Sequence, residues 1–212
     1  MMDEPVLELR RLDEVPAAEC FTRLGKPAQQ RALHFANPKD REEFVAGRLA
    51  LLNFAASLLD VDPVHLVPDY HCPQCGPGQD HGRPRFLLDG GPVPLLLSAS
   101  RASGWVLLAG VVHPIDGSRL GVDLEAIEGV GFDGFDDVAL TESEKRFLVS
   151  FPEQDQATLR ARLWARKEAW LKMTGEGLRH NPAELDVLGL PGLHDITRVQ
   201  LPDGLVAALA LG

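Results

Sequence analysis

The chain has 212 residues, of which 45% are hydrophobic, and carries a formal charge of −10 at neutral pH. That length and composition suit one domain or two small ones, each with a hydrophobic core. The acidic balance argues against a general binder of nucleic acid or of anionic membranes, because recognition of backbone phosphates depends on clustered Lys and Arg.

The sequence also lacks the usual signs of secretion or membrane insertion. No apolar run approaches the roughly 20 residues that span a bilayer, and the acidic start MMDEPVLELRR has no hydrophobic signal core. The three cysteines, Cys20, Cys72 and Cys75, are a sparse and odd-numbered set that does not indicate a disulfide framework. We therefore expect a soluble, cytoplasmic protein with neither a membrane nor a nucleic acid as partner.

The first segments are predicted from their apolar pattern. Pro5 to Leu12 alternates like an edge strand, and Val15 to Leu33 looks helical with a break at Pro27. Residues 37–59, NPKDREEFVAGRLALLNFAASLL, predict a long amphipathic helix that Asn37 caps and Pro38 begins. The helix leaves several cations toward one end, which are either solvated surface charges or a phosphate-binding patch. They are Lys39, Arg41 and Arg48.

The next segment, Asp60 to Gly91, is rich in Pro, Gly and His and is predicted to be a loop. It contains Cys72 and Cys75 in a C-x-x-C pair, flanked by His71 and His81. Such residues bind zinc, but a structural zinc site usually takes four ligands from paired half-sites, whereas these crowd into one short loop. We interpret the segment as an ordinary surface loop, with a zinc site as the alternative.

The middle of the chain predicts a hairpin followed by a linker. Residues 94–112, PLLLSASRASGWVLLAGVV, form two apolar runs around a polar turn that includes Ser98, Ser100 and Arg101. Residues 113–119, HPIDGSR, then have the composition of an interdomain linker.

A short alternating run and a later amphipathic run carry the candidate chemistry. In residues 120–127, LGVDLEAI, the strand period places Asp123 and Glu125 on one face. In residues 164–178, WARKEAWLKMTGEGL, a helix is expected to end at the glycines, with Glu168 and Lys172 one turn apart on the same face. If the helix packs with Glu168 toward the strand, three carboxylates converge, which is a suitable ligand set for Mg²⁺, with Mn²⁺ as the other candidate ion.

The segments around these two runs are predicted to support them. Residues 128–137 are interpreted as a flexible, acidic stretch whose Phe132 and Phe135 are either exposed for docking or buried in the core. A capping box at Thr141 and Glu144 predicts the start of a further helix. The tail, 184–211, has strand-like runs that are expected to contribute core.

The sequence G-V-D-L-E at 121–125, followed by W-x-x-K-E-A-x-x-K-x-x-G-x-G-L at 164–178, resembles the paired signature of 4′-phosphopantetheinyl transferases of the surfactin-synthetase-activating (Sfp) type. The resemblance implies an α+β fold of two similar halves, a pseudo-dimer, with the active site in the cleft between them. The halves would be residues 1–113, on the coenzyme A side, and 114–212, with the metal-binding and catalytic motifs.

The resemblance also implies an activity, that of a holo-[acyl-carrier-protein] synthase. Such an enzyme transfers the 4′-phosphopantetheine arm of coenzyme A to a serine of an acyl or peptidyl carrier protein and releases adenosine 3′,5′-bisphosphate. Family members of this length are usually monomers and are often associated with secondary metabolism. The motifs do not distinguish carriers of fatty-acid, polyketide or nonribosomal-peptide synthesis.

Site residues follow from the same resemblance. Asp123, Glu125 and Glu168 would hold Mg²⁺, with Glu168 as the base and Lys172 on the transferred phosphate. The remaining contacts to coenzyme A match the family's R-x-x-F-x-x-G-R helix, its G-K-P segment and its S-x-S-H-S motif. They are Arg41, Arg48, Arg83, Ser100 and Arg101, with Lys172 shared between both roles. Lys167, from the W-x-x-K-E-A motif, is a further candidate contact to coenzyme A that serves either phosphate or structure.

Two positions depart from the family pattern: Arg101 replaces a usual histidine, and Leu52 lies near a usual arginine. These departures keep an alternative open, a catalytically impaired homologue that only binds carrier proteins. A second alternative is an Mg²⁺-dependent pyrophosphohydrolase that uses water in place of serine and acts on coenzyme A. Each carboxylate taken alone has a simpler explanation as a surface charge of an acidic protein.

Overall fold

The computed structural model describes residues 4–15, 21–72, 75–77 and 80–212, with the backbone alone for residues 77 and 178. Its contacts divide the chain into two units: Met1–Ala99 with Gly104–Asp116, and Ser100–Ser103 with Gly117–Gly212. The sequence-based division after His113 stays a prediction about domains. Cys20, and residues 16–20 of the predicted helix at Val15 to Leu33, lie outside the described residues.

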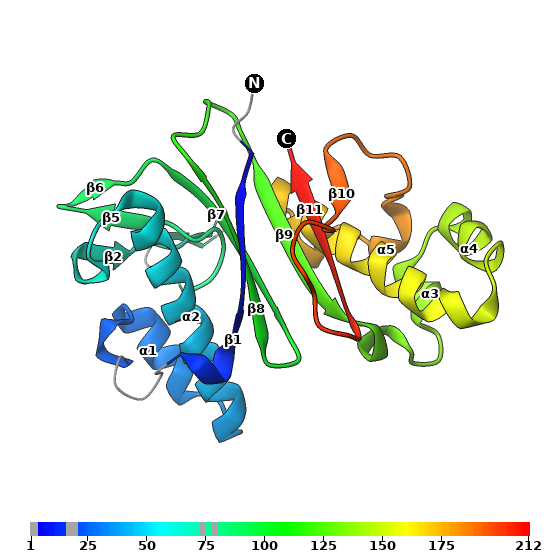
Figure 1. Ribbon diagram of the computed structural model, residues 1–212, viewed down its shortest axis with the longest axis horizontal. Coiled ribbons are helices and arrows are strands. Elements are labelled where there is room, and N and C mark those ends of the chain that lie inside the picture. Colours follow the sequence, from blue (N-terminus) through cyan, green and yellow to red (C-terminus); the bar gives the residue numbers. More distant parts are fainter. Residues whose placement is uncertain (1–3, 16–20, 73–74, 78–79) are drawn as a thin grey trace. The chain divides into compact units, whose positions relative to one another are not determined.

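The first unit is built on one three-stranded sheet and one long helix (Figure 1). The strand order is β1 (Val6–Arg11), β8 (Trp105–Val112), β7 (Leu95–Ala102), so the predicted edge strand is confirmed. Helix α2 (Pro38–Leu59) packs against β8, and the side chain of Asn37 caps it by accepting from the amide of Lys39. A Cβ on Gly110 would lie 2.4 Å from Leu58, so this glycine lets the helix approach the strand closely.

Several short elements complete the first unit. They differ from two predictions, the helix at Val15 to Leu33 and the loop at Asp60 to Gly91. Helix α1 (Lys26–Leu33) begins at the predicted break, because a proline in the first turn loses no intrahelical hydrogen bond. The segment predicted to be a loop contains a three-stranded sheet in the order β2-β5-β6 and a small hairpin. The bounds are η1 Leu12–Glu14, η2 Phe21–Arg23, η3 Pro63–His65, β2 Leu66–Pro68, β3 His71–Cys72, β4 Gly76–Pro77, β5 Phe86–Leu88 and β6 Gly91–Pro92.

The turn between β7 and β8 lies later in the chain than predicted. Ser98, Ser100 and Arg101 belong to strand β7. The chain reverses at Ser103 and Gly104, whose φ angles are +49° and +77°. Two consecutive positive φ angles are the mark of a tight type I′ hairpin turn, and glycine accepts that conformation readily. The motif residues therefore project from a strand.

The second unit repeats the combination of a three-stranded sheet and a 22-residue helix. The strand order is β10 (Leu193–Asp195), β11 (Leu205–Leu211), β9 (Leu120–Ala126), and α5 (Glu153–Thr174) packs against β9 and β11. The helix ends as predicted at Gly175, which has a φ of +80°. The other elements are η4 Ile127–Val130, α3 Phe135–Ala139, α4 Glu142–Val149, η5 Gly177–Arg179 and η6 Pro182–Glu184.

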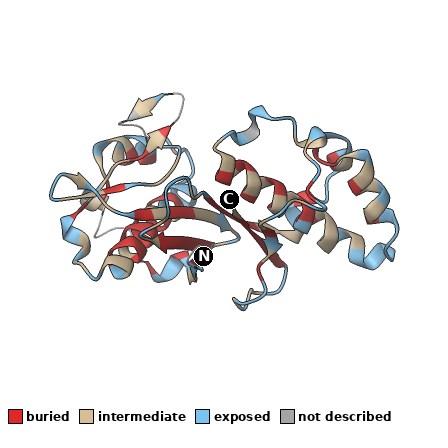
Figure 2. Ribbon diagram, turned by 90° about the horizontal axis from the view of Figure 1, so that it is seen from above, coloured by how far each residue is buried: buried red, intermediate tan, exposed pale blue. Residues whose placement is uncertain are grey.

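The stretch interpreted as flexible contains helical turns. Phe135 starts α3 and is buried, whereas Phe132 is 59% exposed, so each of the two predicted environments is occupied by one ring. The capping box is confirmed: Thr141 accepts from the amide of Glu144, and Glu144 accepts from that of Thr141. Figure 2 shows burial concentrated on the sheet strands and along the long helix of each unit. Within the described residues, no helix is long and apolar enough to cross a bilayer.

We predict that Gly121→Ala disrupts the contact between β9 and α5. A Cβ at this position would lie 2.0 Å from the carbonyl oxygen of Ala169 and 2.6 Å from the amide nitrogen of Met173. Because both are backbone atoms, the helix itself must move, and overpacking of this kind costs roughly 1–3 kcal/mol. Urea unfolding should show a lower midpoint for this variant, whereas Gly129→Ala, where an added Cβ meets nothing within 4 Å, is the matched control. Equal midpoints would contradict the close packing.

Candidate functional site

A stripe of side chains on α5 faces the carboxylates of β9. Trp164, Glu168 and Lys172 are spaced four residues apart and so share one face of the helix. Two of them bond directly to the strand: the indole of Trp164 donates to Glu125, and the ammonium of Lys172 donates to Asp123. The predicted packing of helix against strand is thereby observed within the second unit.

Asp123 lies at the centre of this arrangement and is only 2% exposed. Its Oδ1 accepts from the hydroxyl of Ser100 at 2.7 Å and from Lys172 Nζ at 2.6 Å, and Lys172 Nζ also donates to Ser100 Oγ at 2.9 Å. Among the described residues no group donates to its Oδ2, which is buried. A buried carboxylate oxygen without a partner is costly, so a ligand at Oδ2 would satisfy it.

The surroundings of Glu125 and Glu168 favour the protonated, uncharged form of each carboxyl group. Burial, together with the nearby charge of Asp123, raises the pKa of Glu125 to about 7. The same two causes, burial first and then Asp123, raise the pKa of Glu168, while Lys172 opposes the shift. The indole nitrogen of Trp164 lies 3.1 Å from Glu125 Oε1 and fixes that carboxylate. Three neighbouring carboxylates whose like charges repel one another indicate a place for a cation.

The donor set fits Mg²⁺ by its chemistry. All candidate ligands are carboxylate oxygens, which hard divalent cations prefer, and Asp123 Oδ2 is available to one. The three carboxylates are not drawn together as tightly as a formed ligand set, because the compact trio of potential ligands in the described part of the chain lies elsewhere. The charge of Asp123 nevertheless contributes to the raised pKa of both Glu125 and Glu168, as expected for neighbouring carboxylates.

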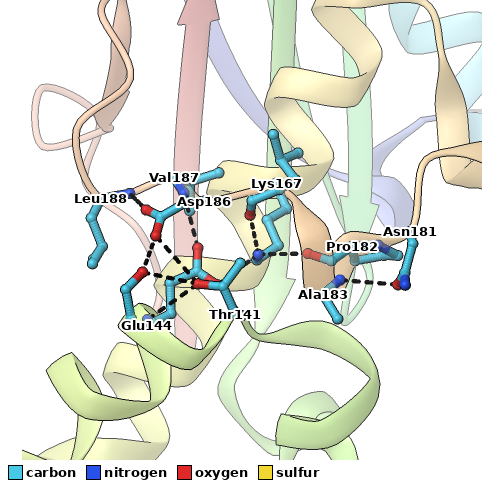
Figure 3. Close-up of polar contacts among 11 residues, drawn as sticks. Thr141, Glu144, Lys167, Asn181, Pro182, Ala183, Asp186, Val187 and Leu188 are labelled. Carbon is cyan, nitrogen blue, oxygen red and sulfur yellow. Dashed lines mark hydrogen bonds and ion pairs between the residues drawn. The ribbon is translucent and has the colours of Figure 1, made fainter.

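Lys167 directs its charge into the core of the second unit. Figure 3 shows its ammonium among groups of the second unit, where it pairs with Glu144 Oε2 at 2.6 Å and donates to the carbonyls of Pro182 and Leu185. Both charged side chains are fully buried. Burial lowers the pKa of Lys167, although Glu144 opposes that shift. This geometry favours the structural alternative for Lys167, and its contact with coenzyme A stays a prediction.

The predicted basic residues of the first unit have diverse environments. Arg48 is not a solvated surface charge: it pairs with Asp80 at 3.1 Å, lies 4.1 Å from the ring of Tyr70, and leaves 18% of its side chain exposed. Arg41 is exposed on α2 and lies over the ring of Phe21, and Arg83 is half-buried. In the second unit, Arg101 is exposed on β7. Leu52, near whose position the resemblance leads us to expect an arginine, is buried in the core at 1% exposure.

Two residues of the site were missed at the level of sequence. The sequence motif assigns no contact to Trp164, although its spacing of four residues from Glu168 places it on the same helix face. Glu144 was recognised as a cap, but nothing local indicates its pairing with Lys167, which is 23 positions further along the chain. Contacts of that kind depend on the tertiary packing of α4 against α5.

Comparison with known proteins points to one class of enzyme. Residues 119–206 match the model of the 4′-phosphopantetheinyl transferase superfamily, and that range contains the carboxylates of β9 and the face of α5 that carries Trp164, Glu168 and Lys172. The chain is also similar to the 4′-phosphopantetheinyl transferase HetI of Nostoc sp. (strain PCC 7120), with 29% identity over 154 residues. That similarity covers 70% of this chain and 58% of HetI, so the chain spans less than two thirds of its relative.

Proposed function

We propose that the protein is an Mg²⁺-dependent 4′-phosphopantetheinyl transferase of the Sfp type. It moves the phosphopantetheine arm of coenzyme A to a serine hydroxyl of an acyl or peptidyl carrier protein, which changes from the apo to the holo form. The observation that carries the proposal is the buried Asp123, joined to Lys172 and Ser100 and flanked by Glu125 and Glu168, inside the range that matches the superfamily.

The three carboxylates of Asp123, Glu125 and Glu168 would hold the ion. Mg²⁺, when bound, supplies positive charge that neutralises the pyrophosphate of coenzyme A and the leaving phosphate. Phosphoryl transfer depends mainly on positioning and on such electrostatic stabilisation. The chain's own residues therefore have to orient the substrate and accept one proton.

Glu168 is the proposed base. A carboxylate oxygen of Glu168 takes the proton of the serine hydroxyl as the serine oxygen bonds to the phosphorus that carries pantetheine. The bond between that phosphorus and the bridging oxygen breaks, and its electrons leave with adenosine 3′,5′-bisphosphate. The position of Glu168 supports this assignment, because it shares the face of α5 that carries Lys172 toward the carboxylate of Asp123.

The second unit's cations would orient the phosphates. Lys172 would contact the transferred phosphate. Its ion pair with Asp123 holds its ammonium beside the carboxylates. Two residues of β7 would be further contacts to coenzyme A. They are Ser100, which donates to Asp123, and the exposed Arg101. From the first unit we propose Arg41, Arg48 and Arg83. We further propose that the protein has two similar halves with the site in the cleft between them. We also propose that it is a monomer and is located in the cytoplasm.

The proposal is tested by weighing a carrier protein. Incubation with coenzyme A, Mg²⁺ and an apo carrier should add the mass of one phosphopantetheine arm to the carrier, with adenosine 3′,5′-bisphosphate as the second product. EDTA should abolish the gain, and excess Mg²⁺ or Mn²⁺ should restore it. Asp123→Ala should abolish the mass gain even in excess Mg²⁺, because the variant lacks the buried carboxylate and leaves Lys172 without its counter-charge.

The same assay separates the alternatives. Release of phosphopantetheine with no change in carrier mass would indicate the pyrophosphohydrolase. Binding of several apo carriers without any mass gain or product release would indicate the impaired binder. Either result would overturn the transferase proposal.

A further inference from the structure

Three potential metal ligands come together in the first unit, and none of the three is itself used in the proposed transfer. One ligand atom each from Cys72, Cys75 and His81 lies within 4.8 Å of the other two. Neither cysteine forms a disulfide. Cys72 is buried, while Cys75 and His81 are exposed. The cluster therefore has an inner anchor and a side that is open to solvent.

The backbone explains how three residues of one short segment meet. Strands β3 and β4 form a tight hairpin in which Cys72 lies opposite Gly76, whose φ is +77°, and Cys75 occupies the turn. The chain then returns to the hairpin: His71 and Arg83 exchange two backbone hydrogen bonds, of 3.2 and 2.9 Å. This second pairing places His81 beside the cysteines.

Gly82 makes the return possible. Its φ is +90°, and a Cβ there would lie 2.3 Å from the carbonyl oxygen of His71 and 2.7 Å from the Cα of Cys72. Both atoms belong to the backbone, so no side chain other than hydrogen is tolerated without moving the hairpin. The close approach is built into the fold and is independent of any bound ion.

We propose that Cys72, Cys75 and His81 bind one zinc ion, with water as the fourth ligand. Two thiolates and an imidazole are typical zinc ligands, and the exposed side of the cluster leaves room for a water molecule. Binding releases the two thiol protons to solvent, and the metal does not change its oxidation state. This replaces the interpretation as an ordinary loop, because the ligands do not have to come from two distant half-sites.

The ion would fasten this segment to α2. Asp80, which precedes His81, is buried, and its main-chain carbonyl accepts hydrogen bonds from Arg31 and Arg48. Asp80 also pairs with Arg48 through its carboxylate. A zinc ion on His81 would therefore hold Asp80 in place, which makes its role structural. Removing it should lower the thermal midpoint of the protein, since a ligand that binds only the folded state stabilises that state.

The experiment is a zinc titration of the full chain, reduced and stripped with a chelator. We expect one Zn²⁺ per chain, retained in excess Mg²⁺. Cys75→Ser and His81→Ala, which alter exposed positions, should each weaken zinc binding by more than the roughly 10–100-fold that is typical when a residue supporting a metal ligand is lost. His65→Ala, an exposed histidine of η3, and Asp123→Asn, in the carboxylate cluster, should keep the stoichiometry at one.

Cobalt provides a readout that does not depend on the folding of any variant. Co²⁺ added to the unsubstituted chain should give a thiolate-to-cobalt charge-transfer band that Zn²⁺ abolishes. Unchanged zinc affinity in both ligand variants would overturn the proposal. So would a missing charge-transfer band, or a disulfide between Cys72 and Cys75 whose reduction yields no zinc binding.

Discussion

Glu168→Gln is expected to reduce transfer to the carrier protein by about 10²–10⁴-fold in kcat, the usual contribution of a positioned base. Glutamine keeps the shape of the side chain on α5 but neither accepts the serine proton nor contributes a charge to the cation site. The rate of holo-carrier formation, followed by mass spectrometry at saturating Mg²⁺, measures the loss.

Glu153→Gln is the matched control for that substitution. It removes the same charge from the same helix, but from an exposed position in the first turn. The control should transfer at the rate of the unsubstituted protein, and both variants should unfold at similar urea concentrations. A Glu168→Gln protein with near-normal turnover would remove this residue from the chemistry and leave the base unassigned.

Lys167→Met is expected to destabilise the fold by about 3–5 kcal/mol, because it leaves the carboxylate of Glu144 buried without its counter-charge. Glu144 keeps its hydrogen bonds from the amides of Thr141 and Val187, but these do not replace a cation at 2.6 Å. Urea unfolding should show the loss as a lower midpoint with an unchanged slope.

The double variant Glu144→Gln with Lys167→Met distinguishes a lost ion pair from lost packing. Once the buried charge is absent, much of the stability should return, as is usual when both members of a buried pair are replaced. Lys145→Met, which disturbs only the surface pairs with Asp137 and Glu142, should change the midpoint little. If Lys167→Met were as mild as Lys145→Met, the pair would contribute little to this fold.

The features that the sequence predicted well are those with local causes. Asn37 caps α2 and Gly175 ends α5 because these residue types favour helix ends in proteins generally. The approach of Glu168 to Asp123 was also predictable, because the periods of strand and helix fix which side chains share a face. Mixed helices and strands followed from the same patterns.

The features that were missed depend on partners distant in the chain. Lys167 resembles its neighbour Lys172 in the sequence, yet α4 and residues 182–185 enclose it, whereas Lys172 reaches Asp123. The strands β2 and β5 were not predicted because each has only three residues, too short a run for the strand period to be recognised. The prolines and glycines around them also favoured a loop. The position of the hairpin turn could not be chosen from composition, because small polar residues fill both possible places.

Strand β7 has a consequence for dividing this protein into parts. Its residues up to Ala99 group with the first unit, whereas Ser100 groups with the second and donates to Asp123. A fragment that begins at residue 117 would contain every proposed carboxylate ligand but would lack this hydroxyl. Independent expression of that fragment should therefore yield an incomplete centre, and coexpression with residues 1–116 would be needed to complement it. The smallest part of the chain that holds the complete proposed site is then larger than the segment that carries the two motifs.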